Sequence, residues 1–124
     1  MRRRLPAVLA SAAFMVTSGA GMAHHSFAMF DQTKEVTLEG TLKELQWTNP
    51  HIWVQVMAPD PATGKQVEWS IEGGSPNGLS RRGWSRNMMK AGDKLTVVIH
   101  PLKNGDHGGS LTKLTVNGKT VGAP

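Results

Sequence analysis

Two adjacent histidines, His24 and His25, are the residues whose types and spacing point most directly to chemistry. If the chain is cut after Ala23, His24 becomes the first residue and carries a free α-amine beside its imidazole. These two nitrogens can chelate a metal ion in a six-membered ring, and His25 adds a second imidazole. Copper(II) stands highest in the divalent affinity series and accepts nitrogen ligands, so it is the first candidate, with zinc or nickel next.

The position of the cut decides the geometry of this site. A cut after Met22 gives Ala23, His24 and His25, in which the third residue is a histidine and amide nitrogens can complete a square-planar copper site. A cut at Ala20 leaves both histidines inside the chain and weakens either version. The alternative interpretation is a flexible polar lead that binds copper weakly and without biological consequence.

Three other histidines lie beside predicted strands. His51 follows a turn and His107 lies in a Gly-rich loop, and both are candidate metal ligands if the segment 24–34 folds back towards them. That segment reaches roughly 36 Å when extended, so distance allows it. The simpler interpretation of His51 is a turn residue bonded to the backbone, and His100 is predicted to be structural.

The tryptophans form a second group of candidate functional residues. Trp53 stands on the strand face opposite Ile52 and Val54, and Gln55 shares its face. If this face is exposed, Trp53, Gln55 and His51 would make a stacking platform for a sugar or another planar ligand. The remaining three, Trp47, Trp69 and Trp84, are expected to fill the core or close its end.

The sequence gives little support for catalysis. No serine lies in a nucleophile motif, cysteine is absent, and the carboxylates are scattered. Glu72, which precedes two glycines, is the one carboxylate that we consider as an additional ligand or a cap. We therefore predict a binding protein and not an enzyme.

The N-terminus has the parts of a signal peptide. Three arginines are followed by the uncharged stretch 5–20, and Gly21 and Ala23 are the small residues expected before a cleavage site. The stretch is too short and too rich in small residues to span a bilayer. We predict a signal peptide over 1–23, a periplasmic or secreted mature chain, and no membrane span after cleavage; an uncleaved anchor is the alternative.

Composition narrows the classes of partner. Residues 1–23 hold three of the fourteen basic residues and none of the nine acidic ones, so cleavage lowers the formal net charge from +5 to +2. Without a clustered basic patch we expect no nucleic-acid binding. The absence of cysteine excludes disulfides and thiolate metal sites.

Alternation of apolar and polar residues predicts five strands, and turns and loops connect them. The first strand begins at Val36 and changes phase after Lys43, and Gly40 inside it allows a bend or bulge. Between the third and fourth strands, two short helical turns are expected, the second capped by Ser85 and ended by Gly92. The five strands cover 36–43, 52–57, 66–72, 95–99 and a last segment through 114–116.

This element order, three strands, a short helical connection and two strands, is that of a small five-stranded OB-like barrel, an all-β fold. We place the barrel at 35–122, after a lead at 24–34. A sandwich or an open sheet of five to six strands is the alternative.

Several motifs carry a resemblance: His24 to Asp31, Trp47 with Asn49 to His51, Trp69 with Glu72, Gly83 with Trp84, and Gly92 with Asp93. With them the chain resembles a bacterial family of small exported proteins of unknown function that share an N-terminal His-His-Ser-Phe motif. The resemblance spans essentially the whole mature domain. It implies export and an OB-like barrel, and it implies no activity, so no catalytic residue is transferred.

Two functional classes follow from these residues. The first is an exported protein that binds copper or another divalent metal through its N-terminal histidines. The second is a non-metal interaction module that binds a glycan, peptide or protein partner on the face of the second and third strands. A passive structural subunit of an envelope assembly is a third possibility, and the sequence leaves the oligomeric state open.

Overall fold

The computed structural model describes residues 25–124, and for residues 25 and 26 it describes the backbone alone. The predicted signal peptide and His24 lie outside the described residues. The elements in chain order are α1 (His25–Ala28), β1 (Val36–Gln46), β2 (Trp53–Pro59), β3 (Gln66–Glu72), α2 (Pro76–Ser80), β4 (Lys94–Pro101), β5 (Gly108–Val116) and β6 (Lys119–Thr120).

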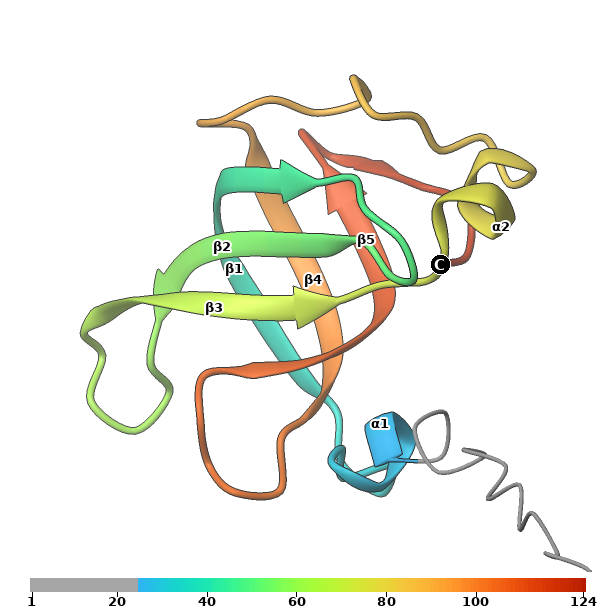
Figure 1. Ribbon diagram of the computed structural model, residues 1–124. Helices are drawn as coiled ribbons and strands as arrows, with labels where there is room; N and C mark the ends of the chain where they lie inside the picture. Colours follow the sequence, from blue (N-terminus) through green and yellow to red (C-terminus); the bar gives the residue numbers. More distant parts are fainter. Residues whose placement is uncertain (1–24) are drawn as a thin grey trace, which may run out of the picture.

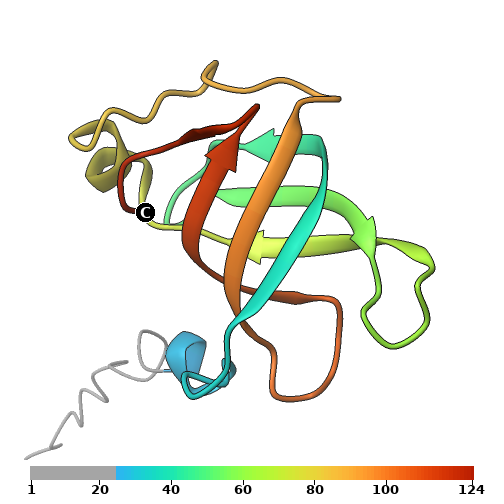
Figure 2. The ribbon, with the colours of Figure 1, turned by 180° about the vertical axis from the view of Figure 1, so that it is seen from behind.

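The five long strands close into a barrel. They are hydrogen-bonded in the order β3-β2-β1-β4-β5, and β5 returns to pair with β3 in parallel (Figure 1). The short β6 extends the sheet beyond β5. Seen from behind, β4, β5 and the first part of β1 run across β2 and β3 (Figure 2). The predicted five-stranded OB-like barrel is therefore confirmed, and the sandwich and the open sheet are wrong.

The long first strand belongs to both halves of the barrel. Its first part, Val36 to Thr41, pairs with β4, and its second part, Thr41 to Gln46, pairs with β2. The register shifts between Leu42 and Glu44, so Lys43 is the extra residue of a bulge. This bulge explains the phase change in the sequence, and it follows closely after the glycine at which a bend was predicted.

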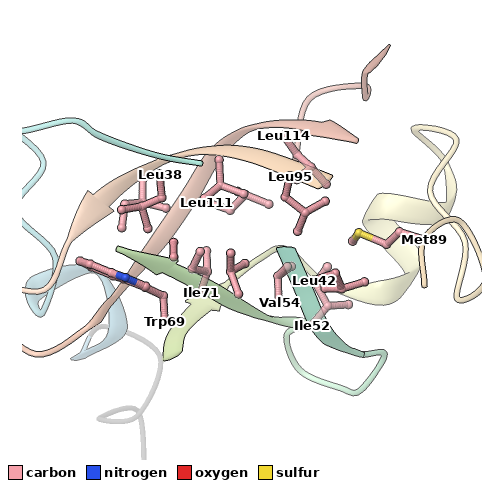
Figure 3. Packing of buried hydrophobic residues seen from close by; sticks show 14 of the residues in the cluster. Leu38, Leu42, Ile52, Val54, Trp69, Ile71, Met89, Leu95, Leu111 and Leu114 are labelled. Atoms are coloured by element: carbon pink, nitrogen blue, oxygen red, sulfur yellow. The ribbon is translucent and has the colours of Figure 1, made fainter. Parts of the chain in front are cut away.

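The barrel is filled by one apolar core. Side chains from all five long strands point towards one another, and Met89 reaches in from the connection before β4 (Figure 3). Trp69 and Trp84 are buried, and Trp47 is half-buried against the same core, as predicted. The core comprises Leu38, Leu42, Ile52, Val54, Val56, Ala58, Trp69, Ile71, Leu79, Trp84, Met89, Leu95, Val97, Ile99, Leu111 and Leu114.

The connection between β3 and β4 differs from the prediction in one respect. Only α2 is helical among residues 73–93, with Ser75 as its N-cap and Pro76 in its first turn. The predicted second helical turn after Ser85 is wrong, because that stretch forms irregular turns. Trp84 and Met89 both bury their side chains, and a helix does not present residues five apart on one face.

The segment before β1 packs against the barrel. Phe30 is buried and bridges to Leu102, the amide of Asp31 donates to the carbonyl of Pro101 (2.8 Å), and the amide of Lys103 donates to the carbonyl of Met29 (2.9 Å). These contacts anchor residues 29–31 beside the end of β4. In the described part of the chain, no helix is long and apolar enough to cross a membrane.

Candidate functional site

Two histidine–carboxylate pairs lie at the end of the barrel that α1 covers. We call this region the α1 end; it consists of α1 with Phe30, the end of β3 with Glu72, the start of β5, and His51, which lies two residues before β2. Sequence reasoning named both histidines as candidate ligands. The structure adds the carboxylate that faces each of them.

The first pair is a short hydrogen bond between two loops. His107, in the loop between β4 and β5, places Nε2 2.5 Å from Oδ2 of Asp60, in the loop between β2 and β3. The imidazole also meets the ring of Trp69 edge-on, with the ring centroids 5.0 Å apart. His107 is therefore fixed by an acid and an aromatic ring.

This hydrogen bond lowers the pKa of Asp60. Donation from His107 holds the pKa of the Asp60 carboxyl below its ordinary value, and the amide of Ala62, which donates at 2.7 Å, acts in the same direction. Burial opposes the shift. The carboxylate form of Asp60 is thus the form that the fold favours.

The second pair is more widely spaced. Nδ1 of His51 lies 3.0 Å from the carbonyl oxygen of Gly73, and Nε2 lies 3.5 Å from Oε1 of Glu72. His51 is held by the backbone as the simpler interpretation predicted, and it faces a carboxylate as well. The side chain of His51 is 38% exposed and that of Glu72 is 13% exposed, so the pair is open to solvent from the histidine side.

Two small cavities flank this arrangement. One, of about 220 Å³, is lined by His51, Glu72, Phe27 and Leu111 among others. The second, of about 230 Å³, is lined by Trp53, His107, Met29 and Leu102 among others. Phe30 and Glu72 line both cavities. The two histidines therefore belong to neighbouring cavities that share a wall.

The segment that follows the N-terminal histidines reaches both cavities. Phe27 and Phe30 contribute to the cavity of His51, and Met29 and Phe30 contribute to that of His107. Folding back of the lead was the condition for a joint site. Residues 27–30 meet that condition, whereas His24 lies outside the described residues and His25 is described by its backbone in α1 alone.

The predicted ligand face is half-buried. Trp53 opposes Glu72 in the β2–β3 register, and its side chain forms part of a cavity wall. Gln55 is also half-buried, and its amide donates to Oε1 of Gln46 at 3.3 Å. Trp53 is thus accessible from the cavity, while Gln55 is engaged with the neighbouring strand.

The three histidines whose side chains the structure describes have different partners. His100 is structural as expected, because its Nδ1 lies 2.8 Å from the carbonyl oxygen of Lys34. His51 and His107 have different carboxylate partners. Within residues 27–124, whose side chains are described, no group of three histidine or carboxylate side chains is placed to hold a metal ion.

Asp60 is the residue of this site that sequence reasoning missed. It lies in a Pro- and Gly-containing turn, where aspartate is common for conformational reasons, and its partner is 47 residues away. No spacing rule connects the two. Only the closure of β5 onto β3 brings them together.

A comparison with models of protein families finds one family that matches this chain. The model described as "Family of unknown function (DUF6152)" matches residues 12–112. The chain belongs to this family. The residues of this chain that match the DUF6152 model include both N-terminal histidines, both histidine–carboxylate pairs and Trp53. Membership confirms the resemblance to an uncharacterised family, and it carries no activity. No curated protein and no solved structure matches the chain.

Proposed function

We propose that this DUF6152 protein is exported to the periplasm or beyond the cell and binds a divalent metal ion, copper(II) first, at its processed N-terminus beside the α1 end. The observation that carries the proposal is the anchoring of residues 29–31 on the barrel, with Phe27 in the wall of the cavity of His51. It brings the chain that follows His24 and His25 to the cavity lined by His51 and Glu72.

The ligand chemistry supports copper. A free α-amine and an imidazole on His24, with a second imidazole on His25, supply the nitrogen donors that copper(II) prefers. His25 is two residues before Phe27, whose side chain lines the cavity of His51. A donor from the barrel therefore lies within a short reach. His107 is the less favourable additional ligand, because its Nε2 is already bonded to Asp60.

The test compares two N-termini. The mature chain beginning at His24 is titrated with copper(II) and followed by electron paramagnetic resonance, beside the same chain extended by Gly-Ser at its N-terminus. We expect the authentic terminus to bind at least about tenfold more tightly, which is a difference of about 1.4 kcal/mol. Equal affinities overturn the proposal. Mass spectrometry of the exported protein tests the cleavage site separately.

A second candidate function rests on the cavity beside Trp53. This cavity is lined mainly by apolar side chains, and Phe27 and Met29 nearby are exposed. An interaction module would use it to take a planar or apolar group of a glycan, peptide or protein partner. Trp53→Ala separates the two functions, because it removes the wall of this cavity and none of the proposed copper ligands.

We also propose that the role is binding and not catalysis. The ring nitrogens of His51, His100 and His107 that have partners face carbonyl or carboxylate oxygens. Such partners orient an imidazole in metal sites and in catalytic sites alike. The proposal of a binding role therefore rests on the sequence, which has no cysteine and no serine in a nucleophile motif.

A further inference from the structure

We propose that the cavity beside Trp53 binds one small uncharged aromatic molecule, such as a phenol, between the outer face of the barrel and the lead. The proposal rests on the second candidate function, because both use this cavity, and it commits the cavity to one class of ligand. It does not depend on the copper site at the processed N-terminus.

The cavity lies between two parts of the chain. Trp53 and Glu72 oppose each other in the β2–β3 register, and their neighbours along the strands are core residues, so their own side chains stand on the outer face of the sheet. Met29 and Phe30 of the lead complete the wall together with Leu102, which follows β4. A ligand in this cavity is therefore held between the sheet and the lead.

The volume of the cavity fits one aromatic ring. It measures about 230 Å³. An apolar cavity of about 150 Å³ is large enough to hold benzene, so this volume admits one ring with a small substituent. The indole of Trp53 offers an aromatic ligand a partner for offset or edge-on packing. Met29 is 53% exposed and leaves a way into the cavity from the solvent.

The wall has few polar groups to satisfy a ligand. They are Ser70, Glu72 and His107, and Nε2 of His107 already donates to Asp60. A single hydroxyl can donate to the carboxylate of Glu72, which only accepts hydrogen bonds and meets His51 at 3.5 Å. The several hydroxyls of a sugar would lose their hydrogen bonds with water against apolar walls. The wall therefore favours a phenol over a glycan.

The charge of the wall disfavours anions. Glu72 is the one acidic residue among the described residues that line the cavity, and none of them is lysine or arginine. The imidazole of His107 in the same wall is paired with Asp60. Because the side chain of Glu72 is only 13% exposed, water and salt screen its charge less than at the surface. An aromatic carboxylate would be repelled by Glu72, whereas an uncharged ring is not.

The backbone around the cavity favours a free molecule over the side chain of a peptide. The amide of Leu102 donates to the carbonyl of Gly108, and the amide of Lys103 donates to that of Met29. These donors are therefore engaged, and the side chains of Met29 and Leu102 are apolar. A peptide would bring its own amides and carbonyls to this apolar surface without partners, at a cost that a free ring avoids.

The test titrates the chain that begins at His24 with p-cresol and follows its four indole N–H signals by ¹H–¹⁵N NMR. The signal of Trp53 is identified by its loss in Trp53→Ala. We expect this signal to shift with a Kd below about 1 mM. The signal of Trp47, which packs against the core, should stay in place.

Three further probes test the ligand class by titration calorimetry. p-Toluate has a carboxylate in place of the hydroxyl of p-cresol, and methyl glucoside represents a glycan. Both should bind at least about tenfold more weakly than p-cresol, because of charge repulsion and unpaired hydroxyls respectively. N-acetyltyrosinamide carries the same phenol ring on a peptide backbone and should also bind more weakly.

Variants of the wall assign the binding to this cavity. Trp53→Ala should weaken p-cresol binding at least about fivefold, because the ring loses its aromatic partner. Glu72→Gln removes the negative charge and should narrow the difference in affinity between p-cresol and p-toluate. The matched control is Gln55→Ala, on the same face of β2 and outside the cavity, which should leave both affinities unchanged. Far-UV circular dichroism checks the fold, and if Trp53→Ala does not fold, Met29→Ala decides.

The outcomes separate this proposal from the functions proposed above. Unmoved indole signals, unchanged p-cresol affinity in the wall variants, or equal affinities for p-cresol and p-toluate overturn it. Tighter binding of N-acetyltyrosinamide or methyl glucoside than of p-cresol also overturns it and leaves the second candidate function standing. Copper titration of the same sample tests the metal site by itself.

Discussion

At the scale of single residues, the two histidine pairs differ in what their geometry stabilises. The contact between Asp60 and His107 is a hydrogen bond between loops, and it favours the ionised acid. The contact between His51 and Glu72 is too long for that role. The two pairs thus combine similar residue types at different separations, 2.5 Å for Asp60 and His107 and 3.5 Å for His51 and Glu72.

Asp60 gives a pH-dependent prediction. Its pKa is lower in the folded chain than the usual 3.8, so its contribution to stability is present above that value and is lost as the pH falls through the folded-state pKa. We expect Asp60→Asn to lower the free energy of unfolding at pH 6, and the difference from the unmodified chain to vanish towards pH 2. Urea denaturation at several pH values measures it.

Asp106 provides the control for this prediction. It is an exposed acid in the same loop as His107, and it accepts from Asn104 instead of a histidine. Asp106→Asn should not reproduce the pH dependence of Asp60→Asn. A difference between Asp60→Asn and the unmodified chain that stays constant from pH 6 to pH 2 would contradict the assigned role.

At the scale of elements, the strands were predictable and their partners were not. Alternation identified β2, β3 and β4 to within a few residues because each has one face in the core. The packing of the lead was not predicted, since Phe30 finds its partner, Leu102, more than 70 residues later in the sequence. The pairing of Glu72 with His51 also depends on strand register, which one sequence does not display.

The bend in β1 gives a prediction for an element. A Cβ at Gly40 would lie 2.0 Å from the carbonyl oxygen of Met57, a backbone atom that cannot move aside without shifting β2. We expect Gly40→Ala to lower the free energy of unfolding by about 1–3 kcal/mol, as overpacked sites do. Chemical denaturation measures the change.

The control for the bend is Thr41→Ala, at the neighbouring exposed position of β1. It changes strand propensity without a backbone clash, so we expect a loss of less than about 1 kcal/mol. Equal losses of unfolding free energy in the two variants would mean that the close approach of Gly40 to Met57 does not cause the effect of Gly40→Ala.

At the scale of the whole molecule, the lead and the barrel are held together by few contacts. Phe30 is buried, yet it lies outside the cluster that fills the barrel. Its removal should therefore release the segment before β1 while the barrel stays folded. Because Phe30 lies outside the barrel core, a change at Phe30 tests the attachment of the lead separately from the stability of the barrel.

Phe30→Ala is the corresponding prediction. We expect faster proteolytic cleavage before Val36 and a loss of unfolding free energy below the about 3–5 kcal/mol typical of a central Phe→Ala change. Leu114→Ala, in the barrel core, should instead lower global stability by about 2–5 kcal/mol and expose the whole chain to the protease. Cleavage of Phe30→Ala at the same rate as the unmodified chain would show that other contacts hold the lead.

The closing seam between β3 and β5 consists of three residue pairs, and β5 is the last long strand of the chain. During synthesis from the N-terminus, the edge of β3 stays unpaired until β5 has emerged, and contacts this distant in sequence form slowly. An incomplete chain would present that bare edge to other molecules, which invites aggregation. A nascent chain of this protein therefore needs β5 to be synthesised, or a chaperone to be bound, before the edge of β3 is covered.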